Sequence, residues 1–251
     1  MQPNELAARN SAFYDALWAD TYLTSPESFN TWALISDLLP AAAMRLEVGP
    51  GLRPRLPISG THFIDASPPA VERLGARGGI ARAGEITALP FVDQGFDLVA
   101  AFDVIEHVMD DRRVFAELTR MLKENGCLIF SVPLHPLHWT VFDDYVGHAR
   151  SYKPADLVQM IADNELVVEK SAVFGMQPNN PRMLRCAVKM LTEHRVAATR
   201  WYNWIFFPLG LLLQKRLKWV AGLLDLTAVD EVLLVCRRKT SGPFAQAIDR
   251  S

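Results

Sequence analysis

Cysteine is scarce in this 251-residue sequence, and the three that occur are far apart: Cys127, Cys186 and Cys236. Their odd number and wide separation give no sign of a disulfide framework or of a cysteine metal site. Each lies in an apolar run, so we expect three buried free thiols. The first residues show no basic start followed by an apolar block, so we expect no signal peptide and a cytoplasmic protein.

A strong charge of either sign is also absent. The chain has 26 basic and 28 acidic residues, for a net charge of -2. Without a global basic field, we expect no nucleic-acid partner. Long apolar runs are missing too, because the segment 201–213 is too short to span a bilayer and contains Pro208 and Gly210.

What is present is typical of a globular protein, with 50% hydrophobic residues and 22% charged residues. Residues 96–103 (FDLVAAFD) form a continuous apolar run, which is typical of a strand covered on both faces. Residues 110–126 carry acids at the start and Gly126 at the end, which predicts a helix that stops at that glycine.

Strand and helix patterns alternate from about Leu46 to the final strand. This alternation predicts an α/β fold with a parallel sheet and helices on both faces. Residues 1–40 read as a helical N-terminal cap that carries aromatic side chains. Residues 41–251 read as one domain, with a mostly helical insertion at 176–229 before the last strand.

The segment 45–67, RLEVGPGLRPRLPISGTHFIDAS, looks like an abbreviated nucleotide-binding unit. A strand enters a glycine turn, and a second strand ends in Asp65, which could accept hydrogen bonds from a ribose. Pro54 stands where a dinucleotide fingerprint has its third glycine, and with Pro57 it leaves little room for a helix. Glu47 would repel a diphosphate but suits a cationic amino group, so the pattern fits an adenosine joined to an amino acid.

Together, LEVGPG, FIDAS and GEITALPFVDQGFDLVAAFDVIEHVMD resemble class I S-adenosylmethionine-dependent methyltransferases. The likeness is to the small-molecule branch that includes quinone-biosynthesis enzymes, and it covers roughly residues 40–175 and the final strand. It implies a doubly wound, Rossmann-like sheet of seven strands with the last strand antiparallel. It also implies S-adenosyl-L-methionine as the cofactor.

The resemblance assigns expected roles to the cofactor-binding residues. Glu47 would contact the amino end of the methionine moiety, and Gly49 and Gly51 would let the backbone pass beneath the cofactor. Asp65 would bind the ribose hydroxyls. The other expected pocket residues are Ala66, Glu85 and Ile86 around the adenine, and Phe102 and Asp103 on the methionine side. The family often has a further glycine and a full helix after Gly51, which this chain replaces with Leu52, Arg53 and two prolines.

Two histidines are candidates for a catalytic base, which is useful when the methyl acceptor must lose a proton. His107 follows Glu106 in DVIEHVMD, and a packing role is the alternative. His148 lies in HPLHWTVFDDYVGHARSY, which resembles a D-x-x-x-G-H-x-R-x-Y element of one methyltransferase subgroup, with a serine in place of its usual second arginine. The alternative is a loop that locks itself through Asp144 and Arg150.

The same loop offers Trp139, Tyr145 and Arg150 as expected contacts to the acceptor. No metal is expected, since methyl transfer needs no ion. The spacing of the nearby candidate ligands also matches no strong metal site: His135, His138, Asp143 and His148.

The segment 201–226, WYNWIFFPLGLLLQKRLKWVAGLLDL, leaves three interpretations open. It could be a core or homodimer-interface helix, a lid over an apolar acceptor pocket, or a peripheral membrane contact that uses Lys215, Arg216 and Lys218 beside Trp219. The lid and membrane interpretations both favour an apolar acceptor.

The expected function is in-line methyl transfer from S-adenosylmethionine to a small-molecule acceptor. One alternative is a non-catalytic module that binds S-adenosylmethionine or S-adenosylhomocysteine. The other is an NAD-dependent oxidoreductase, which the missing third glycine disfavours.

Overall fold

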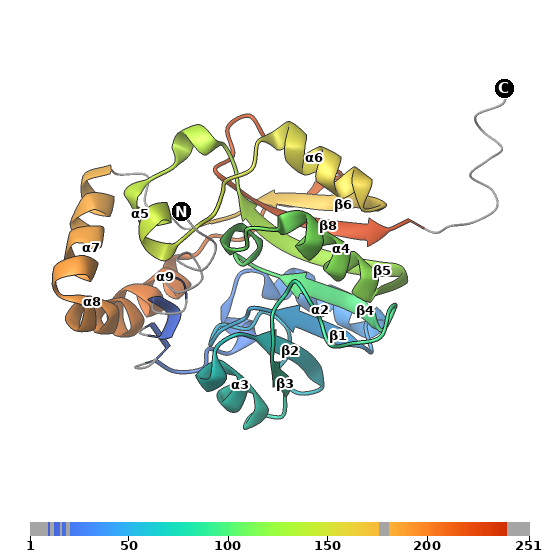
Figure 1. Cartoon of the computed structure of the whole chain (residues 1–251), viewed down its shortest axis with the longest axis horizontal. Coiled ribbons are helices and arrows are strands. Elements are labelled where there is room, and N and C mark those ends of the chain that lie inside the picture. Colours follow the sequence, from blue (N-terminus) through green and yellow to red (C-terminus); the bar gives the residue numbers. More distant parts are fainter. Residues whose placement is uncertain (1–9, 11–12, 16, 19–20, 176–180, 240–251) are drawn as a thin grey trace.

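A computed structural model describes residues 10, 13–15, 17–18, 21–175 and 181–239. One sheet crosses the molecule in the order β3-β2-β1-β4-β5-β8-β6-β7 (Figure 1). Its strands are β1 Arg45–Val48, β2 Thr61–Asp65, β3 Ile80–Ala83, β4 Phe96–Ala101, β5 Leu122–Pro133, β6 Leu166–Val173, β7 Val220–Ala221 and β8 Glu231–Arg238.

The topology confirms the expected Rossmann-like fold. Strands β1 to β5 pair in parallel, whereas β8 is antiparallel to both β5 and β6. The expected count of seven strands is low by one, because the two-residue strand β7 pairs with Lys170 and Ser171 of β6. So short an edge strand leaves no hydrophobic pattern for sequence analysis to detect.

Helices cover the sheet and extend beyond one end of it. The helices are α2 Trp32–Leu38, α3 Pro68–Gly75, α4 Asp111–Met121, α5 Val141–Val146, α6 Pro154–Asp163, α7 Pro181–Glu193, α8 Arg195–Trp201 and α9 Phe207–Leu213, with a π-helical turn, η5, at Tyr202–Phe206 between the last two. Of the expected helical insertion at 176–229, residues 181–213 are mostly helical, whereas residues 214–229 contain no helix and include β7. Residues 176–180 of the insertion, and residues 1–9 of the expected cap, lie outside the described part of the chain.

One predicted boundary is wrong. Helix α4 ends at Met121, not at Gly126, because Leu122 already pairs with Phe96 of β4 and is fully buried. Asn125 then turns the chain with a φ of 59°. Burial of Leu122 in the sheet outweighs the local helix pattern.

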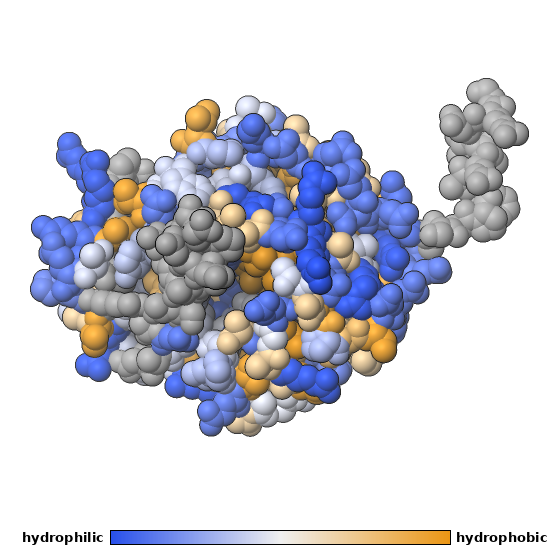
Figure 2. Space-filling view, in the orientation of Figure 1, coloured by the Kyte–Doolittle hydropathy of each residue, from blue (hydrophilic) through white to orange (hydrophobic). Residues whose placement is uncertain are grey.

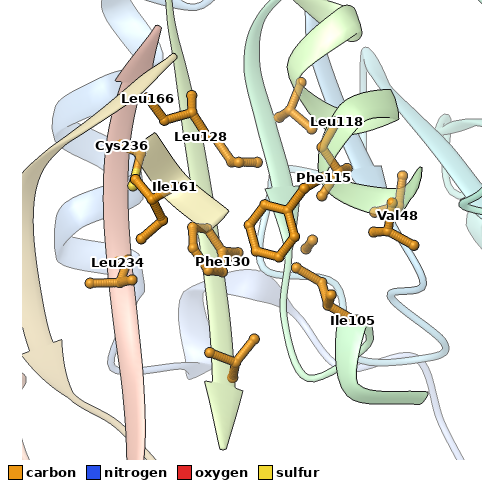
Figure 3. Packing of buried hydrophobic residues seen from close by; sticks show 14 of the residues in the cluster. Val48, Ile105, Phe115, Leu118, Leu128, Phe130, Ile161, Leu166, Leu234 and Cys236 are labelled. Atoms are coloured by element: carbon orange, nitrogen blue, oxygen red, sulfur yellow. The ribbon is translucent and has the colours of Figure 1, made fainter. Parts of the chain in front are cut away.

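Strand side chains alternate between two apolar layers. Along β5, Leu128, Phe130 and Val132 face the layer covered by α4 and α6, and Figure 3 shows Phe115 of α4 packed against Phe130. Cys127 and Ile129 face the opposite layer, which α2 covers.

The expectation of three buried thiols is wrong for one cysteine. Cys127 and Cys236 are buried in the sheet, whereas Cys186 is exposed on α7.

The parallel strands bring the candidate residues together. The carboxyl ends of β1, β2, β4 and β5 meet at one edge of the sheet. Antiparallel β8 starts at that edge, where Glu231 pairs with Pro133. Acidic residues from four separate strands or strand ends, Glu47, Asp65, Asp103 and Glu231, therefore converge.

Replacing Phe115 with alanine tests the packing of α4 on the sheet. Phe115 is fully buried, and its ring centroid lies 5.3 Å from that of Phe130. We expect Phe115→Ala to lower the free energy of unfolding by about 3–5 kcal/mol in urea titrations. The control Leu137→Ala, at a side chain that is 96% exposed, should change it by less than about 0.5 kcal/mol. Equal effects of the two substitutions would contradict this packing.

Candidate functional site

The loop after β1 is held by the carboxylate of Glu47. The backbone N–H of Arg55 donates to Glu47 Oε1 at 2.9 Å and to Oε2 at 3.1 Å, and that of Leu56 donates to Oε2 at 2.9 Å. No helix follows the glycine turn, as Pro54 and Pro57 predicted. Burial raises the pKa of Glu47 to about 7, and the backbone hydrogen bonds partly oppose this rise. Glu47 thus organises the loop, a role that the sequence did not indicate.

The two glycines of this loop are required by the packing of the protein itself. Gly49 has a φ of 63°, and a Cβ there would lie 2.4 Å from Cγ2 of Val104. Gly51 has a φ of 54°, and a Cβ there would lie 2.3 Å from Cζ2 of Trp18. A side chain at either position would strain the backbone and collide with a neighbour. The expected approach of the cofactor over these glycines stays a prediction.

Asp65 ends β2 with its carboxylate tied to the backbone. Gly51 N–H donates to Oδ2 at 2.7 Å, and Ser67 N–H donates to Oδ1 at 2.8 Å. Burial raises the pKa of Asp65, while these two hydrogen bonds oppose the rise. Each carboxylate oxygen keeps a further lone pair, and the buried Ser67 hydroxyl has no partner among the described residues. Adjacent acceptors and a hydroxyl are the groups that bind a ribose diol.

The residues expected around the adenine follow β2 and β3. Ala66 and Glu85 are exposed, whereas Ile86 is 9% exposed and belongs to the apolar core. The backbone N–H of Gly84 donates to the carbonyl of Asp65 at 3.2 Å, so the two loops are neighbours. Their expected contacts with an adenine stay predictions.

Arg55 is a candidate that sequence reasoning missed. Its guanidinium carbon lies 3.5 Å from the ring centroid of Phe29 and 5.7 Å from that of Phe102. The buried Nε and Nη1 donors have no partner among the described residues. Burial lowers the pKa of Arg55 to about 10, against the opposing effect of Asp103 and Glu47, so the side chain is protonated at neutral pH.

Asp103 and Glu231 complete the charged part of the edge. Asp103 has a φ of 51°, its N–H donates to Ser131 Oγ at 2.9 Å, and the Ser131 hydroxyl donates back to its carboxylate. Burial, and then the neighbouring Asp103, raise the pKa of Glu231. Phe102 is 8% exposed and packs near Arg55. Cationic and anionic groups therefore lie side by side.

His107 is enclosed by hydrogen bonds. The Tyr14 hydroxyl lies 3.0 Å from Nε2, and the carbonyl of Gly147 lies 3.3 Å from Nδ1. Burial, followed by the effect of His148, lowers the pKa of His107 to about 3. A neutral ring that donates from Nδ1 and accepts at Nε2 satisfies both contacts. Both ring nitrogens of His107 are thus already engaged.

His148 presents a different arrangement. Its Nδ1 lies 2.9 Å from Asp143 Oδ1, and its Nε2 lies 4.0 Å from Glu106 Oε1. Partial burial would raise the pKa of Asp143, but hydrogen bonds from His148 and Thr140 hold it below its ordinary value. Because an ionised carboxylate only accepts, Nδ1 carries the proton and the Nε2 lone pair faces Glu106.

Glu106 is buried, with one carboxylate oxygen that has no partner among the described residues. Burial, and then the charges of Asp103 and Asp143, raise its pKa well above the ordinary value. Two carboxyl groups beside His148 therefore have opposite protonation preferences.

Local sequence explains why His148 reaches this position. Thr140 and Asp143 form a capping box at the start of α5, and Gly147 ends that helix with a φ of 76°. The next turn is fixed to the sheet edge because Ala149 N–H donates to the carbonyl of Glu106 at 2.7 Å.

The expected acceptor-binding residues are distributed differently. Trp139 donates from Nε1 to Asp144 at 3.0 Å, and the ring centroid of Tyr145 lies 5.5 Å from that of Phe13. Arg150 pairs with Asp111 at 2.5 Å, and the alternative of a loop locked through Asp144 and Arg150 stays a prediction.

The four candidate metal ligands also separate. His135 and His138 bond to Leu226 and Asp230, away from the pair Asp143 and His148. The ligand atoms of Glu106, His107 and His148 lie within 4.8 Å of one another. Nε2 of His107 already bonds to Tyr14, which leaves it less available as a metal ligand. The expectation that no metal is needed stays a prediction.

Comparisons with known proteins concern the part of the chain that forms this edge of the sheet. Residues 52–130 match the family described as "Methyltransferase domain". This segment of the chain is therefore similar to a methyltransferase domain. An uncharacterised protein of Mycobacterium tuberculosis is 28% identical over 174 residues, which cover 65% of this chain and 61% of that protein. The chain therefore matches less than two thirds of the length of such relatives.

Two further likenesses are more specific in name. A demethylmenaquinone methyltransferase of Mycolicibacterium paratuberculosis is 34% identical over 70 residues, or 27% of this chain and 30% of that enzyme. A Thermotoga maritima structure, a SAM-dependent methyltransferase described as a possible histamine N-methyltransferase, has a TM-score of 0.54 and 16% identity, with 94% and 95% of the two chains covered. The structural likeness supports the fold of the methyltransferase domain.

The methyltransferase match implies S-adenosyl-L-methionine as the cofactor, and the residues at this edge of the sheet fit it. Asp65 and Ser67 offer acceptors and a free hydroxyl for the ribose. The unpaired donors of Arg55 suit a carboxylate, and the neighbouring Asp103 suits an ammonium group. This donor set matches the zwitterionic end of an amino acid.

The raised pKa of Glu47 predicts a pH-dependent stability. A carboxyl group whose pKa is about 7 when folded, against an ordinary 4.5, binds its proton more tightly in the folded state. Stability from this group is thus present below pH 4.5 and is lost as the pH rises to 7. From pH 5 to pH 8, wild type should lose about 2–3 kcal/mol more than Glu47→Gln in urea titrations. Parallel pH dependences would refute this assignment.

Proposed function

We propose that this protein transfers a methyl group from S-adenosylmethionine to a small, apolar acceptor that carries an acidic hydrogen. The observation that carries the proposal is the Asp143–His148 pair. The Nε2 lone pair of His148 faces Glu106, at the edge of the sheet that holds the candidate cofactor-binding residues. A histidine oriented in this way by a carboxylate is equipped to accept a proton.

When bound, S-adenosylmethionine supplies a methyl group that its sulfonium already activates for in-line displacement. The protein must then position the acceptor and take its proton. Nε2 of His148 accepts that proton, and the ionised Asp143 stabilises the imidazolium that results. Burial and the neighbouring acids raise the pKa of Glu106, which disfavours a second negative charge beside the base.

Aromatic rings near His148 support an apolar acceptor. Tyr14 packs edge-on against His107 at 5.5 Å, and Trp139 lies 6.3 Å from His148, centroid to centroid. The contact between Phe13 and Tyr145 joins the N-terminal segment to α5 on the same side. The name of the demethylmenaquinone methyltransferase relative also favours an aromatic acceptor, although the match covers only 27% of this chain.

Two other functions make different predictions. A non-catalytic module would bind S-adenosylmethionine but turn over no acceptor. An NAD-dependent oxidoreductase would bind NAD, although the segment where a pyrophosphate-binding helix would begin is a proline-containing loop tied to Glu47.

Calorimetric titration with S-adenosylhomocysteine tests the cofactor assignment. We expect binding to wild type, no binding of NAD, and at least about tenfold weaker binding to Asp65→Asn because the ribose hydroxyls lose a charged acceptor. Asp37→Ala, which changes an exposed acid on α2, is the matched control and should bind normally. Binding of NAD alone, or equal binding by Asp65→Asn, would overturn the assignment.

Substitution of His148 tests the base. In a panel of hydroxylated aromatic and quinol acceptors, S-adenosylhomocysteine release should identify a substrate. With it, His148→Gln should lower kcat by about 10²–10⁴-fold, and Asp143→Asn should lower it less, with little change in cofactor affinity. His138→Gln, at an exposed histidine bonded to Asp230 and not to Asp143, should retain turnover. Full activity of His148→Gln would eliminate the proposed base, and binding without turnover of any acceptor would favour the non-catalytic module.

A further inference from the structure

The segment from α8 through η5 to α9 attaches to the domain by a partly polar face. Asn203 is fully buried, and its side chain donates to the carbonyl of Leu17 at 2.8 Å and accepts from Arg53 at 3.2 Å. Phe207, one turn later, is also buried and packs beneath Arg53 at 3.7 Å and near Phe29. Arg53 thereby joins the loop after β1 to this segment.

The opposite face of the same segment is apolar and exposed. Trp201 is 54% exposed, Ile205 44% and Leu212 83%. Their spacing of four and seven residues places them on one side of a helix. Trp204 and Leu209 flank them with 53% and 47% exposure. The usual amphipathic pattern is therefore inverted, since a buried asparagine faces the protein and large apolar side chains face outward.

This apolar face is concentrated in one part of the molecule. Helices α7, α8 and α9 lie together at one end, away from α4 and α6 (Figure 1). On the face shown in Figure 2, by comparison, hydrophobic residues are scattered among hydrophilic ones. Single exposed apolar residues are normal on a protein surface, but a contiguous group marks an interaction site.

The charge around this face identifies the kind of partner. Residues 194–224 contain five basic residues and no acidic residue, in a chain whose net charge is -2. Lys215, Arg216 and Lys218 follow α9 directly and are all exposed. Tryptophan, leucine and phenylalanine bordered by lysine and arginine are the composition of helices that lie in the surface of anionic membranes.

We propose that the outward face of residues 201–218 binds peripherally to an anionic lipid bilayer. Trp201, Trp204 and Leu212 would enter the headgroup region, and the basic residues after α9 would meet lipid phosphates. No helix in the described ranges is long and apolar enough to cross a membrane, so the contact is one of surface attachment. A second copy of the chain fits less well, because residues 194–224 carry basic residues at both ends and no acid to pair with them across a two-fold contact.

Vesicle flotation with the full chain tests this inference, which is independent of the methyl-transfer proposal. Wild type should float with vesicles of phosphatidylcholine and phosphatidylglycerol, and far less with phosphatidylcholine alone. Trp204→Ser/Leu212→Ser should lower the bound fraction because it removes apolar insertion. Lys215→Glu/Lys218→Glu should weaken binding to the anionic vesicles by at least about tenfold.

Matched substitutions separate this face from the rest of the surface. Arg77→Glu/Arg82→Glu makes the same charge change at exposed residues after α3 and on β3, and Leu137→Ser changes an exposed leucine in the loop after β5. Both variants should bind vesicles as wild type does. Unchanged circular dichroism and unchanged urea-unfolding midpoints in the two variants of residues 201–218 would show that any loss is not misfolding. Absence of wild-type flotation, equal loss in the control variants, or a dimer that Trp204→Ser/Leu212→Ser dissociates would overturn the membrane assignment.

Discussion

A buried carboxylate at the end of β1 sets the shape of the candidate site. Glu47 accepts hydrogen bonds from the backbone of Arg55 and Leu56 and so holds the loop after β1 in place. This loop stands where a helix would otherwise follow the glycine turn. This arrangement places the side chain of Arg55 among Phe29, Phe102 and the acids at the strand ends. It also holds Arg53 where the helical insertion can attach.

The acidic residues at the carboxyl ends of the strands differ in pKa because their surroundings differ. Glu106 and Glu231 have raised pKa values because they are buried near other carboxylates, whereas hydrogen bonds hold the pKa of Asp143 down. Burial thus favours the neutral form of one group of acids, while hydrogen bonds favour the ionised form of Asp143 beside His148. Such a division lets one small site hold a cationic ligand and also stabilise a proton taken up by histidine.

The insertion couples this site to the outer surface. Arg53 stacks on Phe207 and bonds to Asn203, so the loop after β1 and the segment α8–α9 share one contact. If that segment lies on a bilayer, the loop after β1, which neighbours the candidate cofactor-binding residues, lies close to the membrane. An apolar acceptor could then approach from the lipid phase. The two proposals are separately testable, yet the geometry makes them compatible.

The sequence by itself determined the parallel core of the sheet but not strand β7, because strand and helix periods are local properties and parallel strands must align their carboxyl ends. It also located Glu47, Asp65, Asp103 and His148, since each follows a recognisable motif. Only the tertiary structure decided that two donors of Arg55 are buried without a partner in the described part of the chain. It also decided that His107 is enclosed by Tyr14 and Gly147, and that Arg150 pairs with Asp111. Those outcomes depend on contacts between residues far apart in the chain, which no local pattern records.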